Sequence, residues 1–111
     1  MAITKARPSN NKLIKEATRR IVLAAKPNRV LLFGSAARGR IKKDSDLDML
    51  VVMNAPVHRR QLAQKINRSL YGLGIAVDII VATEEDLQKY GQRVGTILRP
   101  ALKDGRVLYE S

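Results

Sequence analysis

Three aspartates occupy positions where this sequence would otherwise form buried strands. Asp46 and Asp48 stand at the start of an apolar run over residues 49–53, and Asp78 lies within a β-branched run over residues 75–82. Side chains two apart on a strand point to the same face, so Asp46 and Asp48 form a pair of carboxylates. Such a pair repels unless a proton or a divalent cation lies between the two groups.

The chemistry that fits these carboxylates is metal-dependent phosphoryl or nucleotidyl transfer. If the strands that carry them are neighbours, Asp78 joins Asp46 and Asp48 on one surface. Three oxygen ligands suit Mg²⁺, which keeps several waters and takes further oxygens from a substrate's phosphates. Two such ions would clamp an in-line displacement at phosphorus. The three aspartates are therefore predicted to be catalytic and metal-binding residues.

A candidate phosphate site directly follows the apolar run over residues 30–33. Gly34 lets a phosphate approach the backbone, and N–H groups at the start of a short helix expected at 36–38 can bind it. The Ser35 hydroxyl can donate a further hydrogen bond. Arg38 belongs to a basic loop that favours a polyphosphate. The basic residues of that loop are Arg38, Arg40, Lys42 and Lys43.

Two other motifs fail on inspection. The spacing of Gly34 and Gly39 resembles the start of a P-loop, but the Lys and the Ser or Thr that must follow are missing. Asp44, Asp46 and Asp48 resemble the first ligands of an EF-hand, but the Gly and Glu required later in that loop are missing.

Composition limits the class of protein. At 111 residues we expect one domain over 1–111, with residues 1–10 as a flexible basic N-terminus. Without cysteine there is no thiolate zinc site or cysteine nucleophile, and the single histidine, His58, is expected at the surface near a helix start. No apolar stretch approaches the roughly 18–20 residues of a membrane span, and no secretory signal is present, so we expect a cytoplasmic protein without a membrane partner.

The net charge of +11 favours an anionic partner, such as a nucleotide, a nucleic acid or an acidic protein surface. Aromatic residues make up only 4% of the chain, which argues against a base-stacking platform. The three tyrosines, Tyr71, Tyr90 and Tyr109, are expected to be packing residues.

Apolar periodicity and turn residues predict an α/β layer architecture, because helices alternate with strands. The predicted elements are a helix at 11–25, strands at 29–33 and 47–53, a helix at 56–71, a strand at 75–82, a helix capped by Thr83, a helix at 94–103 and a strand at 106–109.

These motifs together resemble a known family. Gly34-Ser35, ten intervening residues, Asp46-x-Asp48 and a lone aspartate in the next strand are similar to the nucleotidyltransferase superfamily related to DNA polymerase beta. The segments GSAARG and DSDLDMLVV are similar to sequences of the minimal nucleotidyltransferases of prokaryotes, the MNT-type antitoxins. The resemblance runs from about residue 30 to Asp78 and includes the closing GRVLYE. It implies an α+β nucleotidyltransferase fold, a mixed sheet flanked by helices.

The resemblance also implies an activity and a partner. Gly34 and Ser35 would hold the triphosphate of ATP, Asp46 and Asp48 would bind Mg²⁺, and Asp78 would complete a second Mg²⁺ site and help activate the acceptor hydroxyl. The small members of the family are accompanied by a HEPN-domain protein, as a toxin–antitoxin pair in which AMP is transferred from ATP to a tyrosine of the toxin.

Two alternatives stay open. The fold could serve as a docking antitoxin or nucleotide-binding subunit without turnover, and the intact set of aspartates argues against this. The chain could instead be a basic nucleic-acid-binding protein, which the scarcity of aromatic residues disfavours. The sequence does not identify the acceptor, the nucleotide base or the oligomeric state.

Overall fold

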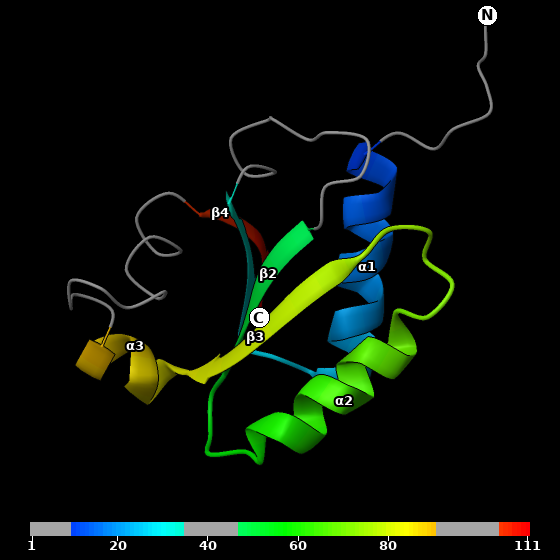
Figure 1. Ribbon diagram of the computed structural model, residues 1–111. Helices are drawn as coiled ribbons and strands as arrows, with labels where there is room; N and C mark the ends of the chain where they lie inside the picture. The colour runs from blue at the N-terminus through cyan, green and yellow to red at the C-terminus, as the bar shows by residue number, and fades with distance from the viewer. Residues whose placement is uncertain (1–9, 35–46, 91–104) are drawn as a thin grey trace, which may run out of the picture.

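The computed structural model describes residues 10–34, 47–90 and 105–111 (Figure 1). From the N-terminus, the elements are α1 (Asn10–Ala25), β1 (Arg29–Phe33), β2 (Leu47–Met53), α2 (Arg59–Ser69), β3 (Val77–Thr83), α3 (Glu84–Tyr90) and β4 (Arg106–Glu110). Figure 1 shows α1 and α2 on the same side of the sheet and α3 beyond the end of β3. The predicted helix at 94–103 lies outside the described residues.

The described strands form one mixed sheet in the order β3-β2-β1-β4. β2 and β3 run parallel, whereas β1 is antiparallel to both of its neighbours, β2 and β4. Parallel strands need a crossover connection, and α2 supplies it between β2 and β3. The predicted mixed sheet flanked by helices is confirmed.

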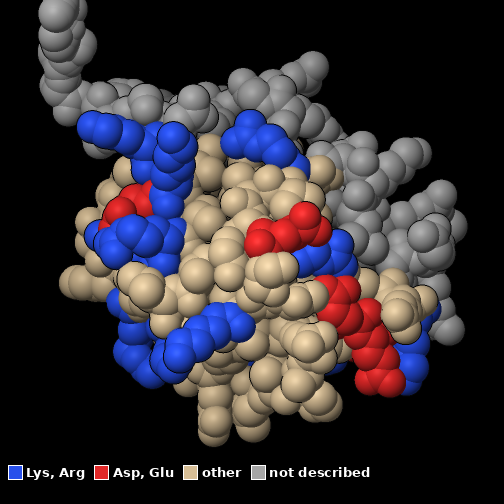
Figure 2. Space-filling model, turned by 180° about the vertical axis from the view of Figure 1, so that it is seen from behind, with Lys and Arg blue, Asp and Glu red and all other residues tan. Residues whose placement is uncertain are grey.

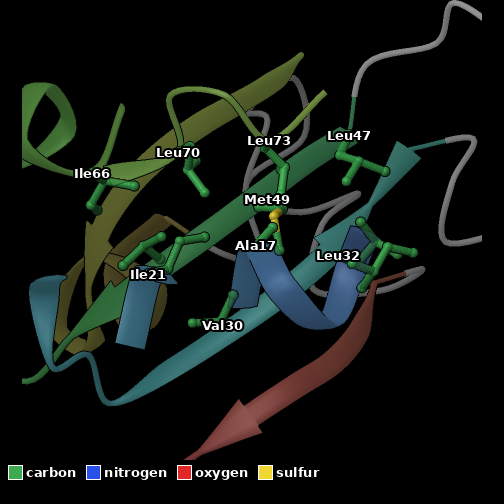
Figure 3. Close-up of a cluster of buried hydrophobic side chains, with 11 residues drawn as sticks. Ala17, Ile21, Val30, Leu32, Leu47, Met49, Ile66, Leu70 and Leu73 are labelled. Atoms are coloured by element: carbon green, nitrogen blue, oxygen red, sulfur yellow. The ribbon is translucent and has the colours of Figure 1, made fainter. Parts of the chain in front are cut away.

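The main core lies between the sheet and the two helices α1 and α2. Figure 3 shows side chains of β1 and β2 meeting those of α1, α2 and the segment after α2. The buried members of this cluster are Ile14, Ala17, Ile21, Val30, Leu32, Leu47, Met49, Val51, Ile66, Leu70 and Leu73. Because successive strand residues alternate between faces, the other residues of β1 and β2 serve the opposite face of the sheet.

A second, smaller cluster covers that opposite face, where α3 contributes one side chain. Its buried members are Leu31, Phe33, Leu50, Val52, Ala82 and Leu87. One face of the sheet therefore packs against α1 and α2, and the opposite face contains the smaller cluster to which α3 contributes. The candidate site lies on this second face.

Local signals explain where the helices begin and end. α1 stops at Ala25 because Lys26 adopts a left-handed φ of 48° and Pro27 cannot continue a helix. α2 begins at Arg59, three residues later than predicted, because His58 is its N-cap: the His58 Nδ1 accepts from the Gln61 N–H at 3.3 Å. His58 is exposed, as expected.

The turn from β3 into α3 follows the predicted cap. The Thr83 hydroxyl accepts from the Asp86 N–H at 3.1 Å, and the Asp86 carboxylate accepts from the Thr83 N–H at 2.9 Å. This reciprocal pair satisfies donors that the first turn of a helix leaves unpaired. β3 itself begins at Val77, two residues later than predicted.

The expectation for the tyrosines is wrong for Tyr71, whose side chain is 90% exposed just after α2. Leu70, at the end of α2, points into the core, so the side chain of the next residue, Tyr71, points away from it. Tyr109 packs against the main core as expected. The Tyr90 side chain lies outside what the structure describes. Across the described residues, no helix combines the length and apolar character needed to span a bilayer.

Candidate active site

The parallel pairing of β2 and β3 places two of the predicted carboxylates side by side. Asp48 and Asp78 are direct partners in the register, and each is the second residue of its strand. Paired residues on adjacent strands point to the same face, and neighbouring strands lie about 4.8 Å apart. Asp48 is half-buried and Asp78 is exposed. The two carboxylates therefore share one face of the sheet, at the end where β2 and β3 begin.

Gly34 completes this corner because β1 runs antiparallel to β2 and ends beside Asp48. Phe33, the last residue of β1, is the register partner of Asp48, and Gly34 follows it with a φ of 76°. A Cβ built on Gly34 would lie 2.5 Å from the Asp48 Oδ2, closer than carbon and oxygen can approach. Both the backbone conformation and the neighbouring carboxylate require glycine here.

Three of the predicted site residues, Asp46, Ser35 and Arg38, lie outside the described residues. The structure therefore brings together Gly34, Asp48 and Asp78 from the predicted set. No group of three metal-ligating side chains occurs within residues 10–34, 47–90 and 105–111. Two carboxylates on neighbouring strands and on one face are oxygen ligands of the kind that a hard divalent cation takes.

Phe33 is a site neighbour that the sequence analysis missed. As the residue opposite Asp48, it lies on the same face and forms an apolar wall beside the carboxylate. Phe33 is the last apolar residue before Gly34, and this position could have indicated that it lies beside the site. An apolar residue at the end of a strand is, however, usually assigned to the core.

The opposite end of the sheet carries a different kind of carboxylate. Glu84, the first residue of α3, accepts two hydrogen bonds from the Arg29 guanidinium, at 2.8 and 3.0 Å, and another from the Asn28 amide. The Arg29 hydrogen bonds are the main reason that the pKa of Glu84 lies below its ordinary value, against the opposing effect of burial. Asn28 in turn accepts from the Ser111 hydroxyl at 3.1 Å.

Asp86 is held in a similar way. Burial is the largest influence on this carboxyl and would raise its pKa, but the Thr83 N–H and hydroxyl together with Arg59 outweigh it, so the pKa of Asp86 is lowered. Arg59 forms an ion pair with Asp86 and thereby links the start of α2 to α3. These two carboxylates are structural groups with arginine partners.

The helical side of the molecule is strongly basic. α2 contains four basic residues and no acidic one, as its sequence RRQLAQKINRS shows. In α1, the Glu16 carboxylate accepts hydrogen bonds from both Arg19 and Arg20. These hydrogen bonds lower the pKa of Glu16 to about 2. Figure 2 shows basic side chains in several patches on the rear face, with fewer acidic side chains beside them.

Comparison with known proteins identifies the family. The model of the nucleotidyltransferase domain matches residues 12–104. A Methanocaldococcus jannaschii protein with the provisional name protein adenylyltransferase is 32% identical over 82 residues, which cover 73% of this chain and 77% of that protein.

Two solved structures share the fold. A protein from Sulfolobus solfataricus, provisionally named a nucleotidyltransferase, gives a TM-score of 0.60 at 24% identity, covering 89% of this chain and 78% of that one. A chain of a toxin–antitoxin complex with AMP-PNP also gives 0.60, at 20% identity, covering 87% and 73%. Since the family model spans most of the chain, this protein belongs to the nucleotidyltransferase domain family and is an enzyme of the nucleotidyl-transferring class.

Proposed function

We propose that this protein uses Mg²⁺ to transfer AMP from ATP to a tyrosine of a HEPN-domain toxin, and so acts as the antitoxin of a toxin–antitoxin pair. The observation that carries the proposal is the register that pairs Asp48 with Asp78 on one face. The provisional name of the M. jannaschii relative supports adenylyl transfer, and the shared fold with a toxin–antitoxin chain supports the kind of partner.

The metal site in this proposal consists of Asp46, Asp48 and Asp78. When bound, two Mg²⁺ ions would neutralise charge on the triphosphate and stabilise the attacking and leaving oxygens. The register that pairs Asp48 with Asp78 supports this assignment, because opposed residues project from the same face of the sheet. Asp46 precedes Asp48 by two residues, the spacing that gives a common face on a strand.

The triphosphate site consists of Gly34, Ser35 and Arg38. Gly34 supports this assignment through its backbone, which lies directly against the Asp48 carboxylate with no side chain between them. A phosphate bound by backbone N–H groups at this turn would therefore lie beside the metal-binding carboxylates. Arg38 and the other basic residues of the loop supply complementary charge.

In the proposed step, the acceptor's hydroxyl oxygen forms a bond to the α-phosphorus of ATP, and the bond from that phosphorus to the bridging oxygen of the leaving pyrophosphate breaks. The hydroxyl proton passes to Asp78, which acts as a general base. Most of the rate enhancement would come from holding the two reactants in line.

The two alternatives predict different behaviour. A docking antitoxin without turnover would bind its partner and leave it unmodified. A nucleic-acid-binding protein would lose affinity steeply as salt rises, because phosphate contacts release counterions. Nucleotide binding at a metal site would instead be abolished by EDTA.

The test measures transfer from α-phosphate-labelled ATP to a purified HEPN-domain protein that binds this chain, followed by intact-mass spectrometry of that protein. We expect one or more adenylyl groups on tyrosine, and complete loss of transfer with EDTA. The double variant Asp46→Asn with Asp48→Asn should lose Mg²⁺-dependent ATP binding while keeping its fold, because two like charges leave the site.

The matched control is Glu85→Gln, which changes an exposed carboxylate on α3 whose only described contact is an ion pair with Lys89 at 3.5 Å. This variant should transfer at the parent rate. An unmodified partner that nevertheless binds the parent protein would contradict the proposal and favour the docking antitoxin.

A further inference from the structure

In the sheet that the described strands form, β3, which carries Asp78, is an edge strand. A hydrogen bond at the start of β3 shows which of its backbone groups face β2. The Leu47 N–H donates to the Ala76 carbonyl at 2.9 Å, at the start of the parallel β2–β3 ladder. In such a ladder, alternate residues direct both of their backbone groups toward the same neighbour. Asp78 and Ile80 therefore face β2 with their N–H and C=O groups.

The intervening residues, Val77, Ile79 and Val81, direct their N–H and C=O groups away from β2. We call these groups the outer edge of β3. Within the part of the chain that the structure describes, none of them has a hydrogen-bond partner. Thr83, the next residue in this series, donates its N–H to Asp86, so the turn into α3 ends the outer edge.

Among the residues that the structure describes, β3 has no lysine or proline and its register with β2 has no bulge. Edge strands are commonly blocked by lysine, proline or a bulge, because unpaired backbone groups attract another strand. β3 reads VDIIVAT, and its only charged residue is Asp78. The other edge strand, β4, has charged residues at both ends and a register shift in its pairing with β1.

We propose that the outer edge of β3 binds the acceptor, as an extended segment of the partner protein that adds a strand to the sheet. This inference rests on the proposed adenylyl transfer and names how the acceptor is held. Strand addition takes its affinity from main-chain hydrogen bonds and its specificity from alternate side chains. The +11 charge of the chain favours acidic residues at the ends of that segment, away from Asp78, whose carboxylate would repel them.

Strand addition at this edge would place the acceptor side chain beside the proposed base. A residue opposite Asp78 on the added strand would point to the same face, because paired strands lie about 4.8 Å apart and their opposed side chains share a face. In a parallel arrangement that residue would bond to the Val77 carbonyl and the Ile79 N–H, which flank Asp78. Its hydroxyl could then give its proton to Asp78 while the hydroxyl oxygen bonds to the α-phosphorus and pyrophosphate leaves.

Amide hydrogen exchange provides the direct test. The probe is a peptide of about nine residues, the length of an ordinary strand, with a central tyrosine, alternating Val and Thr, and Glu at both ends. In the free protein, the Val77, Ile79 and Val81 amides should exchange much faster than those of Asp78 and Ile80. Saturating peptide should slow the first three by at least tenfold and leave the β4 amides unchanged.

Substitution of Ile79 separates backbone docking from side-chain effects. Ile79→Pro removes an outward N–H without removing a bond to β2, which is where proline is tolerated in sheets. Its control is Ile79→Ala, which keeps the N–H and loses more of the side chain. We expect the KM for the peptide tyrosine to rise roughly tenfold for Pro relative to Ala, the size expected for losing one main-chain hydrogen bond, with an unchanged KM for ATP.

The outcomes distinguish this inference from the proposed function. If the parent protein transfers AMP to the peptide but the three outer amides show no protection, or if Ile79→Pro and Ile79→Ala have the same KM, strand addition is wrong and the activity stands. If the outer amides are protected but the protein neither binds Mg²⁺ with ATP nor transfers AMP, the edge binds a strand and the proposed chemistry is wrong.

Discussion

The two ends of the sheet use carboxylates in opposite ways. Where β1 ends and β2 and β3 begin, Asp48 and Asp78 are neighbours of each other, and Asp78 is exposed. At the other end, Glu84 and Asp86 each have an arginine partner, Arg29 and Arg59 respectively. An arginine beside a carboxylate stabilises its charge, whereas two adjacent carboxylates destabilise each other.

We infer from this difference that the active site proposed above lies at the Asp48 and Asp78 end of the sheet. Ion pairs at the Glu84 and Asp86 end join α3, α2 and β1, so charge there supports the fold. At the other end, Asp48 and Asp78 are register partners, so their carboxylates repel each other, and a bound metal would offset that repulsion. The predictions below test this assignment in order of decreasing effect.

The largest effect should come from Asp78→Asn at the site end. Loss of the proposed general base and metal ligand should reduce AMP transfer by roughly 10²–10⁴-fold, as measured with labelled ATP and the proposed HEPN-domain partner. The folded structure should persist, since Asp78 is exposed. A variant that keeps more than a tenth of the parent rate would contradict the assignment of this end.

Gly34→Ala should be the most destabilising substitution near the site. A left-handed backbone costs a residue with a side chain about 1–2 kcal/mol, and the new Cβ must also displace the Asp48 carboxylate. We expect the free energy of unfolding in urea to fall by about 2–4 kcal/mol in total.

Gly72→Ala is the matched control for Gly34. Gly72 has a similar φ of 81° but nothing within 4 Å of an added Cβ, so only the backbone cost applies. Equal losses for the two variants would show that the Asp48 carboxylate does not restrict residue 34.

At the opposite end, Glu84→Gln should weaken the fold and spare the chemistry. The carboxylate accepts two bonds from Arg29 with both side chains about one-quarter exposed. We expect a loss of about 1–2 kcal/mol in urea unfolding, with AMP transfer by the folded variant unchanged. Glu85→Gln should change stability by less than about 0.5 kcal/mol, since that pair is exposed.

The two arginine-paired carboxylates, Glu84 and Asp86, predict how the stability of the fold depends on pH. The pKa values of Glu84 and Asp86 are lowered in the folded protein, so it binds fewer protons than the unfolded chain in acid. Their contribution is complete above the ordinary carboxyl pKa, near 4, and is lost as pH falls through the lowered values. Urea midpoints should therefore fall below about pH 4.5, and less steeply for Glu84→Gln than for the parent.

The smallest effect should be a gain in stability from Asp78→Asn in the absence of metal. Like charges directly opposite on neighbouring strands are destabilising, by about 0.2–1 kcal/mol. Urea unfolding with EDTA should show this gain, and Mg²⁺ with ATP should stabilise the parent but not the variant. A loss of stability in EDTA would mean that Asp78 is a structural residue like Glu84.

Much of the fold could be predicted because its signals are local. The strands β1 and β2 have the predicted bounds, since each is an apolar run that ends at a glycine or a polar residue. The Thr83 cap was predicted from its own residue type and the acidic turn after it. The start of α2 was predicted too early, because a histidine N-cap is a weak signal beside Pro56.

The site could be predicted only in part. That Asp78 shares a face with Asp48 depends on strand order and register, and a slip of one residue would move Asp78 to the other face. The sequence gives no local signal for that register, or for the pair between Arg29 and Glu84, which are 55 residues apart. Both depend on how α2 returns the chain to the sheet.

The place of β4 in the sheet has a consequence for the order of folding. Its pairing with β1 joins residues 29–33 to residues 106–110, which closes a loop of roughly 70 residues, against roughly 14 between β1 and β2. Loop-closure entropy makes the longer connection about 1.4 kcal/mol more costly. Contacts between distant parts of a chain also form slowly. We therefore expect β4 to join last in refolding, after β1, β2, α2 and β3 have associated.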